Sequence, residues 1–240
     1  MKIKIGLLVV IMALAAIAIN AKTDADDPFL VYKADLIKQD LKLYWKNDKG
    51  QNIGSIQNLK FWLEGKNQTL DFAMNAGMYK KDHSPQGLYI EKQKMLVPLD
   101  TTKAAGNFYL KPNGVFYFTT QKTAVICTTQ DFRNNAKIEY ATQSGPMSII
   151  DGQIHPEFKK GSANVNIRNG VGILPDGKIV FVMSKKEINF YDFADYFESL
   201  GCRNALYLDG FVSRAFAPSE NWIQTDGNFG VLFAVTRSEK

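Results

Sequence analysis

The sequence predicts a single α+β domain in which a mixed or antiparallel β-sheet carries a few packed helices. Strand-like runs outnumber the helical ones and do not alternate with them, which argues against a doubly wound fold. Short runs rich in aromatic and β-branched residues, separated by turn residues, predict the strands. They cover residues 29–33, 42–45, 70–74, 87–91, 115–119, 123–127, 178–183, 204–208 and 230–236.

Two segments have the apolar spacing of amphipathic helices. The first runs from about residue 55 to 64 and is closed by Gly65. The second runs from about residue 191 to 200 and places Phe193, Phe197 and Leu200 on one face, with Gly201 in position to cap it. We therefore expect two helices to cover the sheet.

The first residues have the layout of a secretory signal peptide. Lys2 and Lys4 precede an uncharged apolar run from Ile5 to Ile19, and small residues follow. That run is shorter than the ~20 residues of a membrane-spanning helix, which is the alternative. We predict a leader over residues 1–21, one domain over 22–240, export to the periplasm or outside, and no stable membrane span after cleavage.

The charge balance is mildly basic and excludes one class of partner. The formal net charge is +5, and loss of Lys2 and Lys4 with the leader lowers it to +3. Basic residues never form a block longer than two and alternate with acidic ones, so nucleic acid is not predicted as a partner. The two cysteines, Cys127 and Cys202, would form a disulfide after export or remain as two buried thiols.

Polar residues and glycines meet at four junctions beside apolar runs. The apolar run at Ala205–Leu208 stops on Asp209 and Gly210, and Arg214 follows closely. The other three junctions are Asn75–Tyr79, Ser144–Met147 and Ile167–Gly172. Glycine lets the backbone turn sharply beside a ligand, and the arginine fork suits phosphate or carboxylate. We therefore expect one composite site for an anionic ligand.

These junctions resemble, in order, the successive motifs of the phosphodiester glycosidase family. The motifs are Asn75-Ala-Gly-Met-Tyr79, Ser144-Gly-Pro146, Arg168-Asn-Gly-Val-Gly-Ile173 and Leu208-Asp-Gly210 with Ser213, and the resemblance covers about residues 70–235. It implies an α+β hydrolase that cleaves the bond between the anomeric carbon of a sugar and a phosphodiester oxygen. It implies an exported enzyme that releases free sugar and a phosphate monoester, with a glycan or sugar phosphate as substrate.

The residues fit that chemistry in definite roles. Asp209 would stabilise positive charge on the sugar ring or act as nucleophile, and Arg168 would bind the phosphate. His155 would act as an acid or phosphate donor, or is a turn residue with a satisfied ring. The expected substrate-binding residues are Asn75, Gly77, Tyr79, Ser144, Gly145, Gly210, Ser213 and Arg214.

The sequence departs from the family pattern after Asp209. Phe211 and Val212 stand where the family commonly has small residues, and we expect their bulk to narrow the pocket. Two other functions stay open: an envelope module that binds an anionic glycan without turnover, and a metal-dependent phosphodiesterase. No cofactor is required by the predicted chemistry, although Asp209, Asp151 and Asn75 could together hold a divalent cation such as calcium.

Overall fold

The computed structural model describes residues 27–239, so the predicted leader lies outside the described residues. The strands are β1 (Phe29–Ala34), β2 (Asp40–Tyr44), β3 (Gln68–Asn75), β4 (Tyr89–Glu91), β5 (Lys94–Val97), β6 (Gly114–Thr119), β7 (Ala124–Thr128), β8 (Ile138–Ser144), β9 (Met147–Ile150), β10 (Gln153–Ile154), β11 (Asn169–Ile173), β12 (Ile179–Ser184), β13 (Ala205–Tyr207), β14 (Ala215–Ala217), β15 (Trp222–Ile223) and β16 (Leu232–Ser238). The helices are α2 (Ile56–Glu64) and α3 (Phe190–Ser199), with the 3-10 turns η2 (Asn107–Tyr109), η3 (Gly210–Val212) and η4 (Pro218–Glu220).

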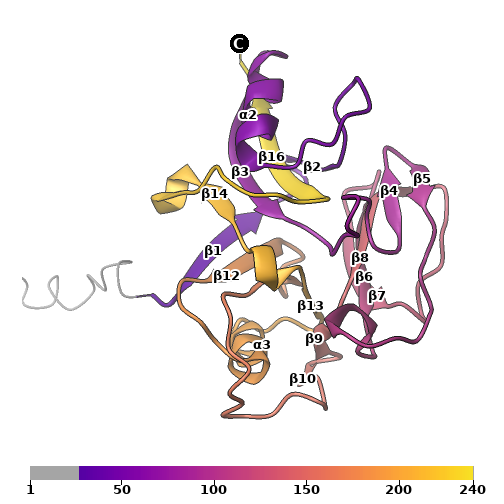
Figure 1. Cartoon of the computed structure of the whole chain (residues 1–240), viewed down its shortest axis with the longest axis vertical. Helices are drawn as coiled ribbons and strands as arrows, with labels where there is room; N and C mark the ends of the chain where they lie inside the picture. Colours follow the sequence, from indigo (N-terminus) through magenta and orange to yellow (C-terminus); the bar gives the residue numbers. More distant parts are fainter. Residues whose placement is uncertain (1–26, 240) are drawn as a thin grey trace, which may run out of the picture.

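The strands form three sheets that surround a common core (Figure 1). Their orders are β1-β12-β11-β13-β9-β10, β15-β14-β3-β16-β2 and β5-β4-β8-β6-β7. Every strand pairing within them is antiparallel. The predicted α+β class is therefore confirmed in outline, but the described chain is richer in sheet than the sequence indicated.

Aromatic side chains join the three sheets at their centre. The Phe233 ring from β16 lies 4.9 Å from that of Phe181 on β12 and 5.3 Å from that of Phe116 on β6. Phe72 on β3 lies 5.0 Å from Phe181, and all four rings are fully buried. Burying an aromatic side chain contributes on the order of 2 kcal/mol, so this cluster fixes the sheets relative to one another.

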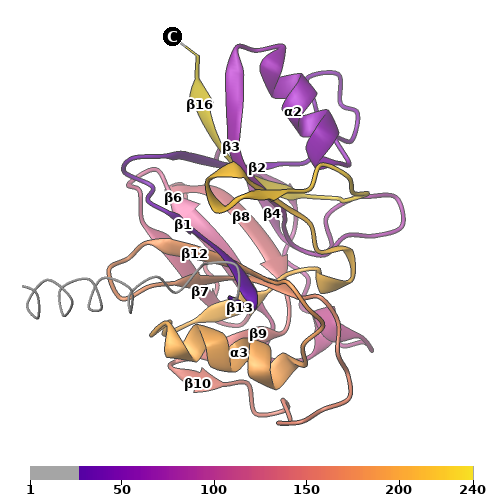
Figure 2. The same cartoon turned by 90° about the vertical axis from the view of Figure 1, so that its left-hand side faces the viewer.

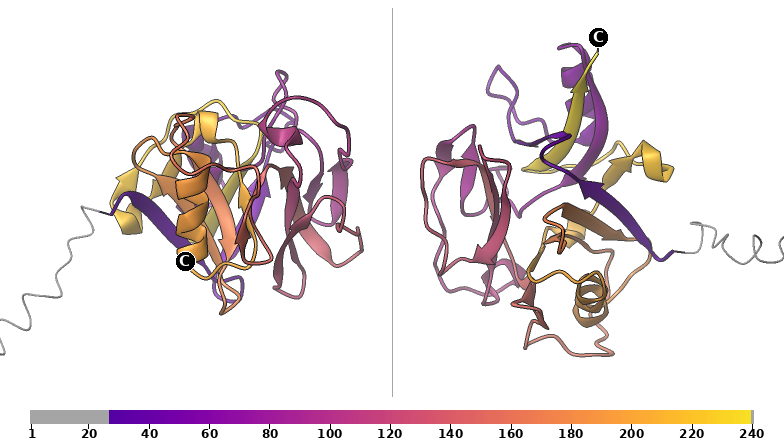
Figure 3. Two further views of the ribbon diagram at one scale, coloured as in Figure 1. Left: turned by 90° about the horizontal axis from the view of Figure 1, so that it is seen from below. Right: turned by 180° about the vertical axis from the view of Figure 1, so that it is seen from behind.

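The two helices lie at opposite ends of the molecule and cover different sheets (Figures 2 and 3). Helix α2 begins after Ser55, whose hydroxyl accepts a hydrogen bond from the Asn58 amide at 3.1 Å, and it buries Ile56, Leu59 and Leu63. Helix α3 buries Phe193 and Phe197 against the six-stranded sheet. Both helices were predicted correctly to within about one residue. No helix within residues 27–239 is both long enough and apolar enough to span a bilayer.

The glycine-rich segment at Asn169–Ile173 is a central strand, β11, and not the turn its glycines suggested. A Cβ atom at Gly170 would lie 3.1 Å from the Phe197 ring, and one at Gly172 would lie 2.7 Å from the Cys202 sulfur. Glycine is needed here because α3 packs directly on the strand. The predicted strands appear within a few residues of their expected positions, while β5, β8, β9, β10, β11, β14 and β15 were not among them.

Both cysteines are free thiols in separate hydrophobic clusters. Cys202 lies under α3, whereas Cys127 packs beside Val115 and Phe132 on the third sheet. Burial raises the pKa of each thiol to about 11. Of the two alternatives, the structure therefore shows two thiols that stay protonated at neutral pH.

We expect Gly77→Ala to disrupt the contact between the segment after β3 and strand β8. A Cβ atom at Gly77 would lie 2.4 Å from the Thr142 hydroxyl and 2.5 Å from the Gln143 carbonyl oxygen, so the backbones must separate. The free energy of unfolding should fall by about 1–3 kcal/mol in urea denaturation. Gly65→Ala is the matched control, because its Cβ would meet nothing closer than 3.6 Å. Equal stability of the two variants would contradict this reading.

Candidate active site

Asp209 lies between the end of β13 and the η3 turn, where its main chain is held on both sides. Its amide donates to the Ala76 carbonyl at 3.3 Å, and its carbonyl accepts from the Asn75 side chain at 2.8 Å. The carboxyl group is largely buried and has no ion-pair partner among residues 27–239. Burial raises its pKa from 3.8 to about 6, although a hydrogen bond from the Phe211 amide opposes the shift.

The Asn75 side chain connects three of the four predicted junctions. Its oxygen accepts hydrogen bonds from the Asn169 side chain and from the Arg214 amide, both at 3.0 Å, while its nitrogen donates to Asp209. Ser213 completes this network, since its hydroxyl lies 3.3 Å from the Asn169 amide oxygen and donates to the Gly210 carbonyl at 2.9 Å. Asn75, Asn169 and Ser213 are all buried. Their side chains therefore position the Asp209 turn.

Arg168 is a fully buried guanidinium beside that turn. It donates through Nε to the Ile188 carbonyl at 2.7 Å and through Nη2 to the Asn164 carbonyl at 2.8 Å. The Phe190 ring lies 3.6 Å beneath it. Within the described residues no carboxylate pairs with this cation. Burial lowers its pKa, but arginine stays charged at neutral pH.

Tyr207 connects Arg168 to the Asp209 turn. Its hydroxyl accepts a hydrogen bond from Arg168 Nη1 at 3.3 Å, the one acceptor of that nitrogen within residues 27–239. Nη1 carries two N–H groups, so one remains for a ligand. A Cβ atom at Gly210 would lie 2.0 Å from the same hydroxyl, so only glycine lets the turn close over it. The Tyr207 hydroxyl thus contacts both the Arg168 guanidinium and the main chain of the turn that carries Asp209.

The Ser144–Pro146 junction lies alongside β13. The Pro146 carbonyl accepts from the Tyr207 amide at 3.1 Å, and the segment at Gly77 packs against Thr142 and Gln143 at the end of β8. Gly145 packs against Asn113, where a Cβ would lie 2.5 Å from the Asn113 side chain. The Ser144 hydroxyl is fully buried and has no hydrogen-bond partner within residues 27–239. A buried hydroxyl without a partner is available to a ligand.

Tyr79 forms another edge of this site. Burial raises its pKa, and the negative charge of Asp209 raises it further, so the two groups lie within electrostatic reach. The Tyr79 hydroxyl donates to the Asn228 carbonyl, and its ring stacks on His83 at 5.4 Å. Its hydroxyl is therefore engaged by the protein, and its ring face is the part available to a sugar.

His155 was predicted as a catalytic residue, but the structure does not bring it to Asp209. It follows the edge strand β10, which β9 separates from β13, a span of about 10 Å at the usual strand spacing. Its ring is 1% exposed, stacks on Phe158 at 4.8 Å and accepts from the Glu157 amide. Burial lowers its pKa. Its ring packs on Phe158 of the cluster under α3, and its buried Nε2 has no hydrogen-bond partner within residues 27–239, so the ring is not fully satisfied as the alternative expected.

The Arg214 side chain also departs from its expected role. Its Nε lies 2.9 and 3.0 Å from the two carboxylate oxygens of Asp226, and its Nη1 donates to the Ser213 carbonyl. The contribution of Arg214 to the site is its main-chain amide, which binds Asn75. Of the two arginines, Arg168 is therefore the one without a carboxylate partner within residues 27–239.

The cation site drawn from Asp209, Asp151 and Asn75 does not form. Asp151 lies in the β9–β10 turn beside Asn204 and Arg203, at the start of β13, whereas Asp209 follows its end. Five residues of extended chain separate such points by about 16 Å. The Asn75 oxygen is already bonded to Asn169 and Arg214. Among residues 27–239 no group of three or more His, Cys, Asp or Glu side chains is placed to hold a metal.

Phe211 and Val212 do not narrow the site as expected. The Phe211 side chain is 90% exposed, and Val212 packs into the cluster beneath α2. Both residues belong to the η3 turn that follows Asp209, and one lies in solvent while the other packs against the core. The sequence analysis also missed Tyr207 and Asn169. The strand alternation of 205–208 and the Arg168-Asn169 pair were signals that could have identified them.

Comparison with known proteins agrees with this geometry. A family model described as phosphodiester glycosidase matches residues 68–233. The uncharacterized protein YigE of Escherichia coli strain K12 is 36% identical over 194 residues, which cover 79% of this chain and 76% of YigE.

Solved structures share the fold at low sequence identity. The zebrafish N-acetylglucosamine-1-phosphodiester alpha-N-acetylglucosaminidase catalytic domain, auto-inhibited by its pro-peptide, has a TM-score of 0.56 at 11% identity, with 89% of each chain covered. A hypothetical protein from Synechocystis scores 0.53 at 12% identity, covering 87% of this chain and 59% of that one. A putative exported protein from Burkholderia pseudomallei scores 0.53 at 10% identity, covering 86% and 73%. From the extent of the family match and the identity to YigE, this chain belongs to the phosphodiester glycosidase family.

Proposed function

We propose that this protein is an exported hydrolase of sugar phosphodiesters that cleaves the glycosidic C–O bond. The observation that carries the proposal is the buried Arg168 guanidinium, which has no carboxylate partner within residues 27–239 and shares Tyr207 with the Asp209 turn. Burying a cation is costly unless an anion accompanies it. A substrate phosphate bound at Arg168 Nη1 would supply that anion next to the one carboxylate of the turn.

Each residue of the proposed site has one role in the reaction. Arg168 binds the phosphate, and the free Ser144 hydroxyl adds a donor. Asp209, when ionised, stabilises positive charge at the anomeric carbon or attacks it. The bond from that carbon to the phosphate oxygen breaks, its electron pair leaves with the phosphate monoester, and water supplies the oxygen of the free sugar. Because the phosphate is a good leaving group, a strong general acid is not needed.

Export is a part of this proposal that depends on the leader alone. Lys2 and Lys4 before the apolar run Ile5–Ile19 support a signal peptide over residues 1–21. N-terminal sequencing of the protein recovered outside the cytoplasm would reveal the cleavage site, and an intact Met1 there would contradict it.

We expect the mature protein to release free sugar and a phosphate monoester from some member of a panel of sugar 1-phosphodiesters. Phosphorus NMR identifies the monoester, and oxygen-18 from the solvent should appear on the sugar. Asp209→Asn should lower kcat at least a hundredfold. Oxygen-18 on phosphate, or turnover abolished by a chelator, would indicate a metal-dependent phosphodiesterase instead. Binding without turnover, retained in Asp209→Asn, would indicate a binding module.

The raised pKa of Asp209 predicts that the catalytic group reduces stability at neutral pH. Its folded-state pKa of about 6 exceeds the ordinary 3.8, so its contribution to the free energy of unfolding is intact below pH 4 and is lost as pH rises through 6. Asp209→Asn should therefore be about 1–3 kcal/mol more stable than wild type at pH 7.5 and equal to it near pH 4. Over the same range kcat/KM of the wild type should rise with pH. Asp176→Asn, at an exposed turn, is the control, and stabilisation at both pH values would contradict the assignment.

Arg168→Lys should lose both stability and anion binding. A lysine cannot reach the Ile188, Asn164 and Tyr207 acceptors together. The free energy of unfolding should therefore be about 2–4 kcal/mol lower in the variant. Inorganic phosphate should raise the Tm of the wild type and leave that of Arg168→Lys unchanged. Arg203→Lys, whose side chain is 81% exposed, is the matched control. An equal rise of Tm with phosphate in all three proteins would place the anion elsewhere.

A further inference from the structure

Three lysines gather on the loops beside the Ser144–Pro146 junction, outside the site described above. Lys111 is half-buried and donates through Nζ to the Asn113 side chain at 2.9 Å. Asn113 is the residue against which Gly145 packs, so the Lys111 ammonium lies next to that junction. Lys80 follows Tyr79, and Lys103 lies on the 100–106 loop before η2. The three therefore border the active site on its Ser144 side.

These lysines form no salt bridge within residues 27–239, although the Asp100 carboxylate lies within electrostatic reach of both Lys111 and Lys80. Within residues 27–239 none of the three has a carboxylate within 4.0 Å. Burial and the like charge of Lys103 lower the pKa of Lys111, while Asp100 opposes this. The Asp100 carboxylate is itself held by the amide and hydroxyl of Thr102, at 2.9 and 2.6 Å. Like charges gathered without ion pairs produce a local positive potential.

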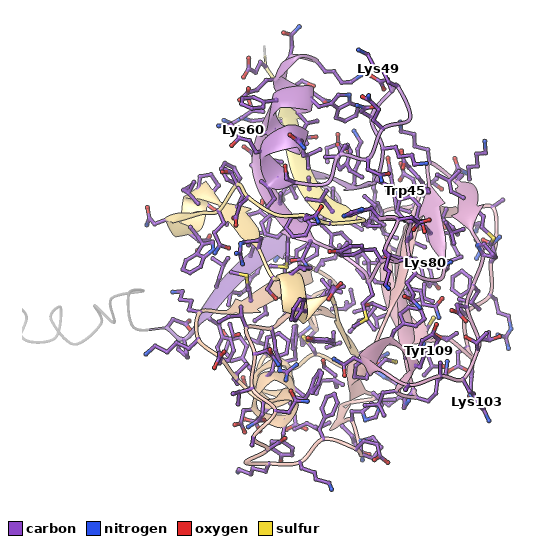
Figure 4. All side chains as sticks on the ribbon, viewed as in Figure 1. Trp45, Lys49, Lys60, Lys80, Lys103 and Tyr109 are labelled. Atoms are coloured by element: carbon purple, nitrogen blue, oxygen red, sulfur yellow. The ribbon has the colours of Figure 1, made fainter. Side chains whose placement is uncertain are left out.

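Tyr109 adds a polar aromatic side chain to the same surface. Its hydroxyl accepts a hydrogen bond from Gln86 at 2.7 Å, and the Gln86 amide donates to the Met78 carbonyl, which ties this loop to the Asn75–Tyr79 junction. In Figure 4, Tyr109 lies between Lys80 and Lys103, whereas Lys49 and Lys60 lie towards the α2 end of the molecule. Lys80 and Lys103 thus lie apart from Lys49 and Lys60 on this face.

We propose that Lys80, Lys103 and Lys111 form a second anion subsite, which binds the neighbouring phosphate of a phosphodiester-linked glycan. The inference rests on the proposed function and specifies its substrate: a chain of sugars joined through repeated phosphodiesters, rather than a single sugar phosphodiester. One phosphate would lie at Arg168 beside the bond that breaks. The next phosphate along the chain would lie at the lysines, and an intervening sugar would pass Ser144 and Tyr109.

The test compares substrates that differ in the number of phosphates. Oligomers of glucose linked through 1-phosphodiesters, with either one or three phosphates, are assayed against the Lys80→Ala/Lys103→Ala double variant. The matched control is Lys49→Ala/Lys60→Ala, which removes the same charge from the α2 end. For the three-phosphate oligomer we expect KM to rise about three- to tenfold in the first variant with kcat unchanged, and the one-phosphate oligomer and the control to show no change.

Salt and binding measurements separate this proposal from the proposed function. Added salt should weaken wild-type binding of the three-phosphate oligomer more steeply than that of the one-phosphate oligomer. Calorimetry with Asp209→Asn measures binding without turnover, so a lysine-dependent gain with the longer oligomer would support the subsite even if wild type hydrolyses neither. An equal loss for both oligomers, or an equal effect of the control variant, would overturn the subsite and indicate general charge attraction.

Discussion

The hydrogen bonds of the Asn75 side chain are the constraint on which the site depends. One amide group joins the end of β3 to Asn169 at the start of β11 and to the main chain of Asp209 and Arg214. Asn75 and Arg214 adjoin the paired strands β3 and β14, whereas Asn169 and Asp209 adjoin the paired strands β11 and β13 of another sheet, so the Asn75 side chain links two sheets. A buried amide with both ends bonded fixes orientation, because any displacement leaves several polar groups without partners. The Asp209 turn is therefore positioned by side-chain bonds, over sheets already fixed by their aromatic core.

The proposed functional groups are two buried charged side chains, and burying each of them costs free energy. Arg168 is buried over Phe190 with carbonyl and hydroxyl partners, and Asp209 is a largely buried carboxyl with a raised pKa. The two charges form no ion pair, and the Tyr207 hydroxyl contacts Arg168 on one side and the Gly210 main chain on the other. A direct ion pair would stabilise the fold but occupy the donors that an anionic substrate requires. Because the two charges are not joined in an ion pair, both remain available to a substrate.

The sequence predicted local structure well, because helix periodicity and strand composition are local properties. It also selected Asn75, Ser144, Arg168 and Asp209 as site candidates, since polar residues next to glycine mark backbone that a ligand or another segment approaches. It predicted His155 as a catalytic residue because His155 follows Ser144 closely in the sequence. Strand β9 and the β9–β10 hairpin lie between the two residues, so closeness in the sequence does not place them together. It could not show that Tyr207 accepts a hydrogen bond from Arg168, because these two residues are 39 positions apart and meet only through the pairing of β11 with β13.

The Asp209–Ser213 turn shows how a departure from a family pattern can leave a site open. Gly210 is needed because the Tyr207 hydroxyl occupies the place of its Cβ, and Ser213 fixes the turn through the Gly210 carbonyl. Between these two constraints the backbone directs Val212 inward, beneath α2, and Phe211 outward into solvent. Large side chains are tolerated at both positions because one lies in solvent and the other packs against the hydrophobic cluster beneath α2. Side-chain volume in a sequence motif therefore limits a pocket only when the backbone geometry directs that side chain into it.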